Sequence, residues 1–219
     1  MPVGIFIALF GYLLGSVPTG IVLTRLFSKA DPRQSGSKNI GATNIYRTSG
    51  KILGILTLIG DMLKGSIPIW MAIMWAQHDW RGIPDFWIAV VGLSPIVGHI
   101  FPIFLGFKGG KGVATGVGVY LAIAPFSVLT TLLLWGLIVY LTRYVSLGSI
   151  IATAAVPFWT LLYYGLLLPS PHLLGLIIVA VAGCALIVAK HHDNIRRLWK
   201  GTENKIGSRV GPTSHSPAS

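Results

Sequence analysis

Apolar residues fill most of this chain in long stretches, and short polar or proline-containing segments separate them. A helix that crosses a membrane needs about 20 predominantly apolar residues, and most of the stretches reach or approach that length. The pattern therefore predicts an all-α polytopic membrane protein with about seven transmembrane helices. The predicted spans are residues 3–24, 52–76, 85–105, 112–124, 126–142, 147–168 and 172–190.

The fourth predicted span is short and glycine-rich, and only Pro125 separates it from the fifth. A single merged span over residues 112–142 would scatter the basic residues over both faces of the membrane. Separate spans place every Lys and Arg on one face, except Arg81 on the other face and Lys64 within a span. By the positive-inside rule the basic face is cytoplasmic, so we expect the N-terminus outside and the C-terminus inside.

Composition supports a membrane protein. Hydrophobic residues make up 53% of the 219 positions and charged residues only 11%, whereas soluble domains carry about 25% charged residues. The net charge of +11 follows from the basic loops, and nothing in the chain resembles a nucleic-acid-binding module. We expect residues 1–207 to form one integral-membrane domain, and the polar residues 208–219 to be a disordered tail.

The first polar segment whose residues could form a functional site is GSKNIGATNIYRTSGK, residues 36–51. Its glycines let backbone N–H groups point into a common concavity, and Arg47 can bind a phosphate through two parallel hydrogen bonds. A solvated basic loop is the alternative interpretation. The neutral side chains that would add hydrogen bonds to an anion are Ser35, Ser37, Asn39, Thr43 and Asn44.

The second segment, GHIFPIFLGFKGGKGVATG, spans residues 98–116. Lys108 and Lys111 lie among closely spaced glycines just before an apolar helix, and the N-terminus of a helix favours an anion. The spacing does not match the nucleotide-binding pattern GxxxxGK[ST]. His99, at the inner end of a predicted span, is interpreted as a packed, hydrogen-bonded histidine.

The third segment, KHHDNIRRLWKGTENKIG, spans residues 190–207 and holds the densest set of proton-handling groups. His191, Asn194 and Glu203 are its candidate functional residues. A zinc site is not favoured, because no further ligands are near. Arg196, Arg197 and Lys200 are interpreted in part as an anchor for lipid headgroups.

Two other places add candidates. The segment TRYVSLGS, residues 142–149, follows a predicted span and adds Ser146 or Ser149, with Arg143, to the same basic face. Asp61 and Lys64 are spaced i, i+3 within the second span, so each can neutralise the other. They are interpreted either as a structural pair or as the edge of a polar cavity.

Missing motifs narrow the chemistry. The chain has no GxSxG nucleophile elbow, and no histidine is followed five residues later by an aspartate. An enzyme built from these segments would act on an already activated substrate without a protein nucleophile. An anion or organophosphate transporter, or a non-catalytic protein whose basic loops hold anionic lipid, are the other classes that the pattern allows.

The sequence resembles the membrane acyl-phosphate:glycerol-3-phosphate acyltransferases of bacterial phospholipid synthesis, the PlsY family. The resemblance rests on SGSKNIGATNIYR, GHIFPIFLGFKGGKGVAT and KHHDNIRRLWKGTENKI, in that order, and covers all but the last dozen residues. It implies transfer of a fatty acyl group from acyl phosphate to the 1-hydroxyl of glycerol 3-phosphate, which gives lysophosphatidate and inorganic phosphate. It implies no cofactor and no metal.

The resemblance also implies residue roles and a cellular setting. The residues expected to be catalytic are Arg47, Lys111, His191 and Asn194. The base that deprotonates the 1-hydroxyl is either His191 or the departing phosphate of the donor. The protein is expected in the bacterial inner membrane, as a monomer, with its active site on the cytoplasmic face. A soluble enzyme that supplies acyl phosphate is a further expected partner. The residues expected to bind substrate are Ser35, Ser37, Asn39, Gly41, Thr43, Asn44, Lys108, Ser146 and Glu203.

Overall fold

The computed structural model describes residues 2–28, 31–76 and 84–207, and within these ranges it contains helices and loops but no strand. The prediction of an all-α protein is therefore confirmed. The α-helices are α1 (Pro2–Ser16), α2 (Thr19–Phe27), α3 (Ala42–Ser49), α4 (Lys51–Trp75), α5 (Asp85–Ile100), α6 (Val113–Ile123), α7 (Pro125–Thr142), α8 (Val145–Thr160), α9 (Leu173–Ala189) and α10 (His192–Trp199). Residues 208–219 lie outside the described residues.

Several helices are long and apolar enough to cross a membrane. In the part of the chain that the structure describes, four qualify: α4, α5 with its extension to Leu105, α7, and α8 with its π-helical continuation to Leu167. The bent pairs α1–α2 and α9–α10 raise the number to at most six. Helix α6 has 11 residues and is about 16 Å long, roughly half the hydrocarbon thickness. A count of seven full spans stays a prediction.

The first predicted span, residues 3–24, is two helices rather than one. Helices α1 and α2 meet at Val17 and Pro18 and are bent by 42°. Proline cannot donate a backbone hydrogen bond, and it disfavours helical geometry at the residue before it. The break leaves the carbonyl of Val17 available to a side chain from α4.

Large apolar side chains cover the outside of the helices. Leu26, Leu133, Leu141 and Leu166 are each at least 68% exposed. Soluble monomers rarely expose so much contiguous apolar surface, whereas such side chains pack against lipid tails in a bilayer. The chain is thus a multi-pass membrane protein.

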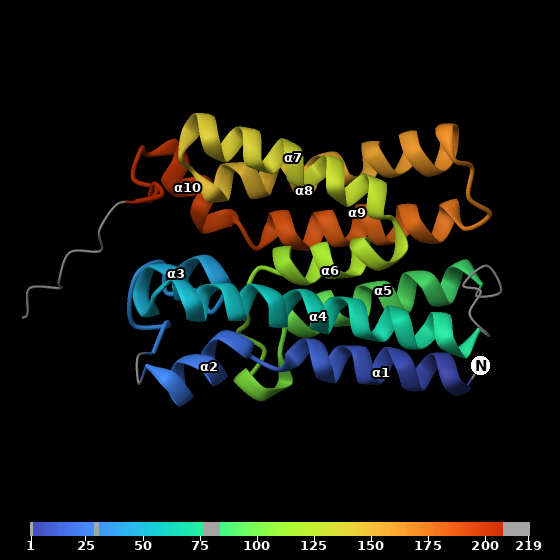
Figure 1. Ribbon diagram of the computed structural model, residues 1–219, viewed down its shortest axis with the longest axis horizontal. Coiled ribbons are helices and arrows are strands. Elements are labelled where there is room, and N and C mark those ends of the chain that lie inside the picture. Colours follow the sequence, from blue (N-terminus) through green and yellow to red (C-terminus); the bar gives the residue numbers. More distant parts are fainter. Residues whose placement is uncertain (1, 29–30, 77–83, 208–219) are drawn as a thin grey trace, which may run out of the picture.

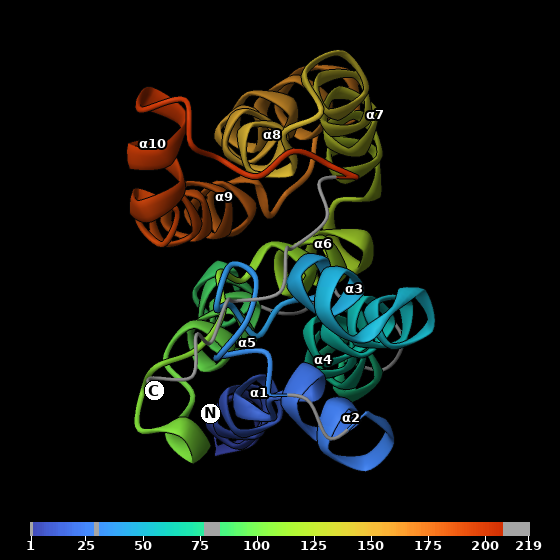
Figure 2. The same cartoon turned by 90° about the vertical axis from the view of Figure 1, so that its left-hand side faces the viewer.

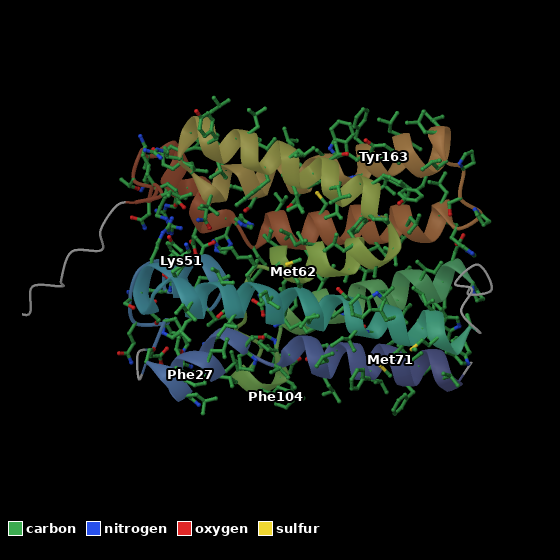
Figure 3. The ribbon with its side chains drawn as sticks, viewed as in Figure 1. Phe27, Lys51, Met62, Met71, Phe104 and Tyr163 are labelled. Atoms are coloured by element: carbon green, nitrogen blue, oxygen red, sulfur yellow. The ribbon has the colours of Figure 1, made fainter. Side chains whose placement is uncertain are left out.

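The helices form two groups with α6 between them (Figures 1 and 2). Helices α1 to α5 lie on one side and α7 to α10 on the other. The N-terminus lies at one end of the molecule, and α2, α3 and α10 lie at the opposite end. Figure 3 places Lys51 and Phe27 at that second end, and Met62 deeper, on the side of α4 that faces the other group.

Helices α4 and α6 approach so closely that a side chain at their crossing point is excluded. A Cβ on Gly118 would overlap the carbonyl group of Met62. At the same crossing, Ser66 donates a hydrogen bond to the Gly118 carbonyl over 2.9 Å. This contact fixes α6, and the basic loop that precedes it, against the wall formed by α4.

Candidate active site

Asn44 organises the first polar segment. Its side-chain amide donates hydrogen bonds to the carbonyls of Pro32 (2.9 Å), Ser35 (3.2 Å) and Asn39 (2.8 Å), and its Oδ1 accepts one from the Ser37 N–H (2.8 Å). The backbone must fold tightly around this side chain, and Gly36 provides a φ of +62°. Asn44 thus shapes the loop and has little capacity left for a ligand.

Lys111 comes from the second segment, immediately before α6. The loop is fixed to the end of α5, because Gly110 and Gly109 donate their N–H groups to the carbonyls of His99 (3.1 Å) and Ile100 (3.2 Å). Gly112 precedes α6 as its N-cap residue, and the N-terminus of the helix has no side-chain cap. Free N–H groups and the helix dipole at such an end favour an anion.

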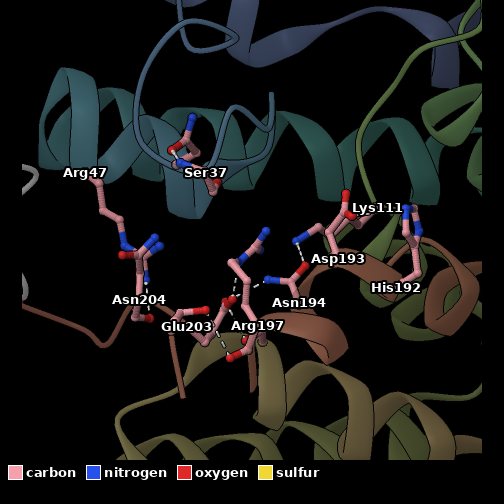
Figure 4. A network of polar contacts seen from close by, with 12 residues as sticks. Ser37, Arg47, Lys111, His192, Asp193, Asn194, Arg197, Glu203 and Asn204 are labelled. Carbon is pink, nitrogen blue, oxygen red and sulfur yellow. Dashed lines mark hydrogen bonds and ion pairs between the residues drawn. The ribbon is translucent and has the colours of Figure 1, made fainter. Parts of the chain in front are cut away.

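Glu203 is the centre of the third segment (Figure 4). Its Oε1 accepts hydrogen bonds from Ser146 (2.8 Å) and Asn194 (2.7 Å), and its Oε2 accepts one from Arg197 (2.6 Å). Burial alone would raise the pKa of the Glu203 carboxyl, but these hydrogen bonds outweigh it and the pKa is lowered. Glu203 is therefore an ionised acceptor that ties α8 and α10 together.

Lys111 joins this network through Asn194, because its ammonium group donates a hydrogen bond to Asn194 Oδ1. Burial is the main cause that lowers the pKa of Lys111 to about 8. Glu203 opposes this effect. The lysine is therefore a half-buried cation with a lowered pKa, and an added anion would stabilise its charged form.

Arg47 lies on α3, across the cavity from α10 (Figure 4). Its guanidinium donates one long hydrogen bond, of 3.4 Å, to the Asn204 carbonyl. Burial lowers the pKa of Arg47, and the Glu203 charge opposes this. Arginine nonetheless stays charged at physiological pH, and most of its five N–H donors remain available.

His191 follows the end of α9. Its Nδ1 lies 2.7 Å from the Ile187 carbonyl, so Nδ1 donates and Nε2 is the acceptor nitrogen. Burial and the nearby Lys111 lower the pKa of His191 to about 4. The imidazole is therefore neutral at pH 7.

A polar cavity of about 1280 Å³ collects these groups. Of the residues that the sequence predicts for the site, Ser35 and Lys108 do not line it, since Ser35 contributes only its carbonyl to Asn44 and Lys108 is exposed. The predicted residues that do line it are Ser37, Asn39, Gly41, Thr43, Asn44, Arg47, Lys111, Ser146, His191, Asn194 and Glu203.

The structure also adds residues that the sequence interpretation set aside. Asp61 and His99 line the same cavity. The sequence offered the edge of a polar cavity as one of two interpretations of Asp61, whereas it interpreted His99 only as a packed histidine. Arg197, interpreted as a headgroup anchor, instead pairs with Glu203 at 2.6 Å. Ser149, which the sequence offered as the alternative to Ser146, lies one helical turn after it on α8 and also lines the cavity.

An apolar chamber of about 550 Å³ adjoins the polar cavity between α6, α7, α8 and α9. The residues that line both spaces are Val113, Val117, Leu132, Trp135 and Ser149. A phosphate head would meet cations and N–H donors in the polar cavity, and an apolar tail directed along the shared residues would meet the apolar lining of the chamber.

Fold and site together define a helical membrane protein with a cavity lined by Arg47 and Lys111 beside an apolar chamber, which suits an enzyme of lipid metabolism. The sequence profile of the glycerol-3-phosphate acyltransferase family matches residues 5–201. The glycerol-3-phosphate acyltransferase of Geobacter sulfurreducens is 49% identical over 195 residues, which cover 89% of this chain and 93% of that protein. That of Rubrobacter xylanophilus is 41% identical over 207 residues, which cover 94% and 97%.

Solved structures agree. The crystal structure of PlsY (YgiH), an integral membrane glycerol 3-phosphate acyltransferase, in its glycerol 3-phosphate form has a TM-score of 0.82 and 38% identity, and covers 93% of this chain and 96% of its own. The structure of its lysophosphatidic acid form has a TM-score of 0.80 and 37% identity, and the match covers 93% of this chain and 95% of that chain. The chain belongs to the glycerol-3-phosphate acyltransferase family and is an acyltransferase.

Proposed function

We propose that this protein transfers a fatty acyl group from acyl phosphate to the 1-hydroxyl of sn-glycerol 3-phosphate, and releases lysophosphatidate and inorganic phosphate. The observation that carries the proposal is the junction of the cavity of about 1280 Å³ with the apolar chamber. Both substrates carry a phosphate, and one carries an acyl chain. Arg47, Lys111 and the uncapped N-terminus of α6 supply the positive charge and N–H donors that two phosphates require.

The reaction needs no covalent enzyme intermediate. The 1-hydroxyl oxygen attacks the acyl carbonyl carbon, the new ester bond forms, and the bond to the phosphate oxygen breaks. Acyl phosphate is a mixed anhydride with a good leaving group, so positioning and charge stabilisation suffice. Ser146 is unsuited to act as a nucleophile, because its hydroxyl donates to a carboxylate already shared with Asn194 and Arg197.

The proton of the 1-hydroxyl needs an acceptor. His191 presents a neutral imidazole, but a pKa of about 4 makes it a weak base. A phosphate group, with a second pKa of about 6, is more basic. We therefore assign the proton to the departing phosphate, and give His191 and Asn194 the task of orienting the reactants.

The basic end of the molecule suggests the setting. Most Lys and Arg of the described residues belong to the segments that contain α2, α3 and α10, and these helices lie together at one end of the molecule (Figure 1). The positive-inside rule makes this the cytoplasmic side of a bacterial inner membrane. A soluble enzyme would then deliver acyl phosphate to this face, and one chain holds a complete cavity, which fits a monomer.

The test is to incubate the purified protein with palmitoyl phosphate and radiolabelled sn-glycerol 3-phosphate and to identify the products. We expect 1-palmitoyl-glycerol 3-phosphate and an equal amount of inorganic phosphate. A parallel reaction receives palmitoyl-CoA as donor, with no product expected. Product from palmitoyl-CoA alone, with protein that is helical by circular dichroism and monodisperse, would refute the proposed donor.

A further inference from the structure

Helix α10 turns away from the apolar helix α9 that precedes it. The two helices are bent by 56°, and Figure 2 shows α10 at the outer edge of its group, beside α9. The helix has eight residues and is about 12 Å long. With α9 along the membrane normal, α10 therefore rises about 7 Å, which is close to the depth of the headgroup layer on one side of a bilayer.

Two cations and a tryptophan form the outer face of α10, which we define as Arg196, Trp199 and Lys200. These residues are three or four positions apart along the helix and share one side of it. All three are exposed, Trp199 to 88%. Among the described residues, neither cation has a side-chain hydrogen bond or an ion pair. The acid of the helix, Asp193, lies in the first turn, 3.4 Å from His192, so the outer face carries unpaired positive charge.

The headgroup of an anionic phospholipid matches the chemistry of this face. Arginine can bind a phosphodiester through two parallel hydrogen bonds, and lysine adds a point charge on a flexible stem. Tryptophan is enriched where a membrane meets water, because its ring is largely apolar and its N–H needs a polar partner. Basic residues beside an exposed aromatic ring are typical of helices that lie in the interface of a membrane.

The inner face of the same helix holds part of the active site together. Asn194 accepts a hydrogen bond from Lys111 and donates one to Glu203, and Arg197 pairs with Glu203 at 2.6 Å. A helix as short as α10 is not stable by itself in water, so it keeps its place only through contacts along its sides. A contact on the outer face would therefore also hold Asn194 and Arg197 in position.

We propose that the outer face of α10 binds the phosphodiester headgroups of anionic phospholipids, and that this contact holds α10 against the active site. Each cation near an anionic membrane surface strengthens association about fivefold, so two cations together strengthen it about 25-fold. The effect on the reaction rests on the proposed function, whereas the lipid contact itself does not involve the substrates.

The first test compares the reaction in two membranes. Nanodiscs are made of phosphatidylcholine alone, or of equal parts of phosphatidylcholine and phosphatidylglycerol, which is anionic. We measure kcat with saturating palmitoyl phosphate and glycerol 3-phosphate, because a negative surface repels the acceptor and raises its KM whatever α10 does. We expect the wild-type kcat to be at least about threefold higher with phosphatidylglycerol.

Three double variants separate the outer face from the general charge of the protein. Arg196→Gln/Lys200→Gln removes both charges and should have the same kcat in the two membranes. Arg196→Lys/Lys200→Arg keeps both charges and should keep the wild-type response. The matched control, Arg25→Gln/Lys51→Gln, removes two exposed cations of α2 and α4 at the same end of the molecule. Its response should also stay at the wild-type value.

The second test needs no turnover. Hydrogen–deuterium exchange of the peptide that covers residues 190–207 reports how often α10 opens. We expect phosphatidylglycerol to slow this exchange at least about threefold in the wild type, and not in Arg196→Gln/Lys200→Gln. This result does not depend on acyl phosphate being the donor, so an inactive preparation tests the proposed function and leaves the lipid contact to be decided by exchange.

Wild-type exchange that is equal in the two membranes would overturn the inference, and it is the result expected if a soluble acidic protein binds the outer face instead. A response that persists in Arg196→Gln/Lys200→Gln, or that disappears in Arg25→Gln/Lys51→Gln, would also overturn it, because cations outside α10 would then be responsible. Slower exchange with an unchanged kcat in active protein would overturn the link between the lipid contact and the active site.

Discussion

Asn44 and Glu203 are saturated by hydrogen bonds within the protein, whereas Arg47 makes one long hydrogen bond and faces the cavity. Polar residues of the same motif therefore differ in what they can offer a substrate. Residues whose hydrogen-bonding groups are all used within the protein hold loops and helices in place. Cations with unused N–H donors can bind the phosphate of a substrate. This distinction depends on distances that are invisible in the motif.

Replacement of Arg47 by lysine tests its role as a planar, two-pronged phosphate ligand. We expect Arg47→Lys to lose about a hundredfold or more in kcat/KM, since lysine keeps the charge but not the bidentate geometry. The control is Lys38→Arg, at an exposed loop position, which should stay within about twofold of wild type. Similar activities of the two variants would remove the bidentate argument.

The pH dependence tests Lys111. Its pKa is lowered to about 8, so it is cationic below that pH and loses its charge above it. We expect kcat/KM for glycerol 3-phosphate to fall above about pH 8, approaching tenfold per unit. In Lys111→Arg the fall should move to higher pH, whatever the rate at neutral pH, and an unchanged profile would assign it to another group.

Some site residues could be found from sequence and others could not. Polar segments stand out in a chain that is mostly apolar, so they mark candidate functional residues in the sequence. Four site residues belong to such segments: Arg47, Lys111, Asn194 and Glu203. Asp61 and His99 lie 38 positions apart within two apolar spans. Only the packing of α4 beside α5 shows that they face one cavity.

At the level of helices, hydropathy predicted where the chain is helical and apolar, but not where helices break. The fourth and fifth predicted spans are the separate helices α6 and α7, because Pro125 favours the first position of a new helix. The same rule did not reveal the break at Pro18, since the apolar run continues through it. Hydropathy also did not predict the short helices α3 and α10, because they lie in polar segments. Contacts with residues distant in the sequence hold these segments in place.

The crossing of α4 and α6 predicts a sharp difference between two glycines. Gly118→Ala would press a methyl group into the Met62 carbonyl, and we expect it to lower the free energy of unfolding by about 1–3 kcal/mol. Gly136→Ala on α7 meets nothing within 4 Å and should be neutral or stabilising by up to about 1 kcal/mol. Thermal unfolding in detergent measures both, and equal midpoints would contradict the close-packing argument.

At the level of the whole molecule, residues from both groups of helices line the cavity, and α2, α3 and α10 lie at one end (Figure 1). Charge distribution along the sequence predicted this sidedness, because insertion depends on charge and hydropathy rather than on tertiary packing. It could not predict that the wall of one group supplies Asp61 and His99 while the other supplies Ser146 and Glu203.

Thiol labelling tests the orientation. In a Cys184→Ala background, Ser170→Cys lies between α8 and α9, and Lys200→Cys follows α10, at the opposite end. A membrane-impermeant maleimide should label position 170 in intact spheroplasts, and position 200 only after permeabilisation. The reverse pattern would place the active site outside the cell.

The hydrogen bond from the Ile206 N–H to the Arg143 carbonyl, 2.8 Å long, fastens the segment that carries Glu203 onto the turn between α7 and α8. This segment follows α10 in the chain, and Lys111 is linked to Glu203 by hydrogen bonds through Asn194 on α10. A nascent chain therefore carries the phosphate loops long before it has the acid and amide that complete the site. The site is therefore complete only after helices α1 to α10 have all been synthesised.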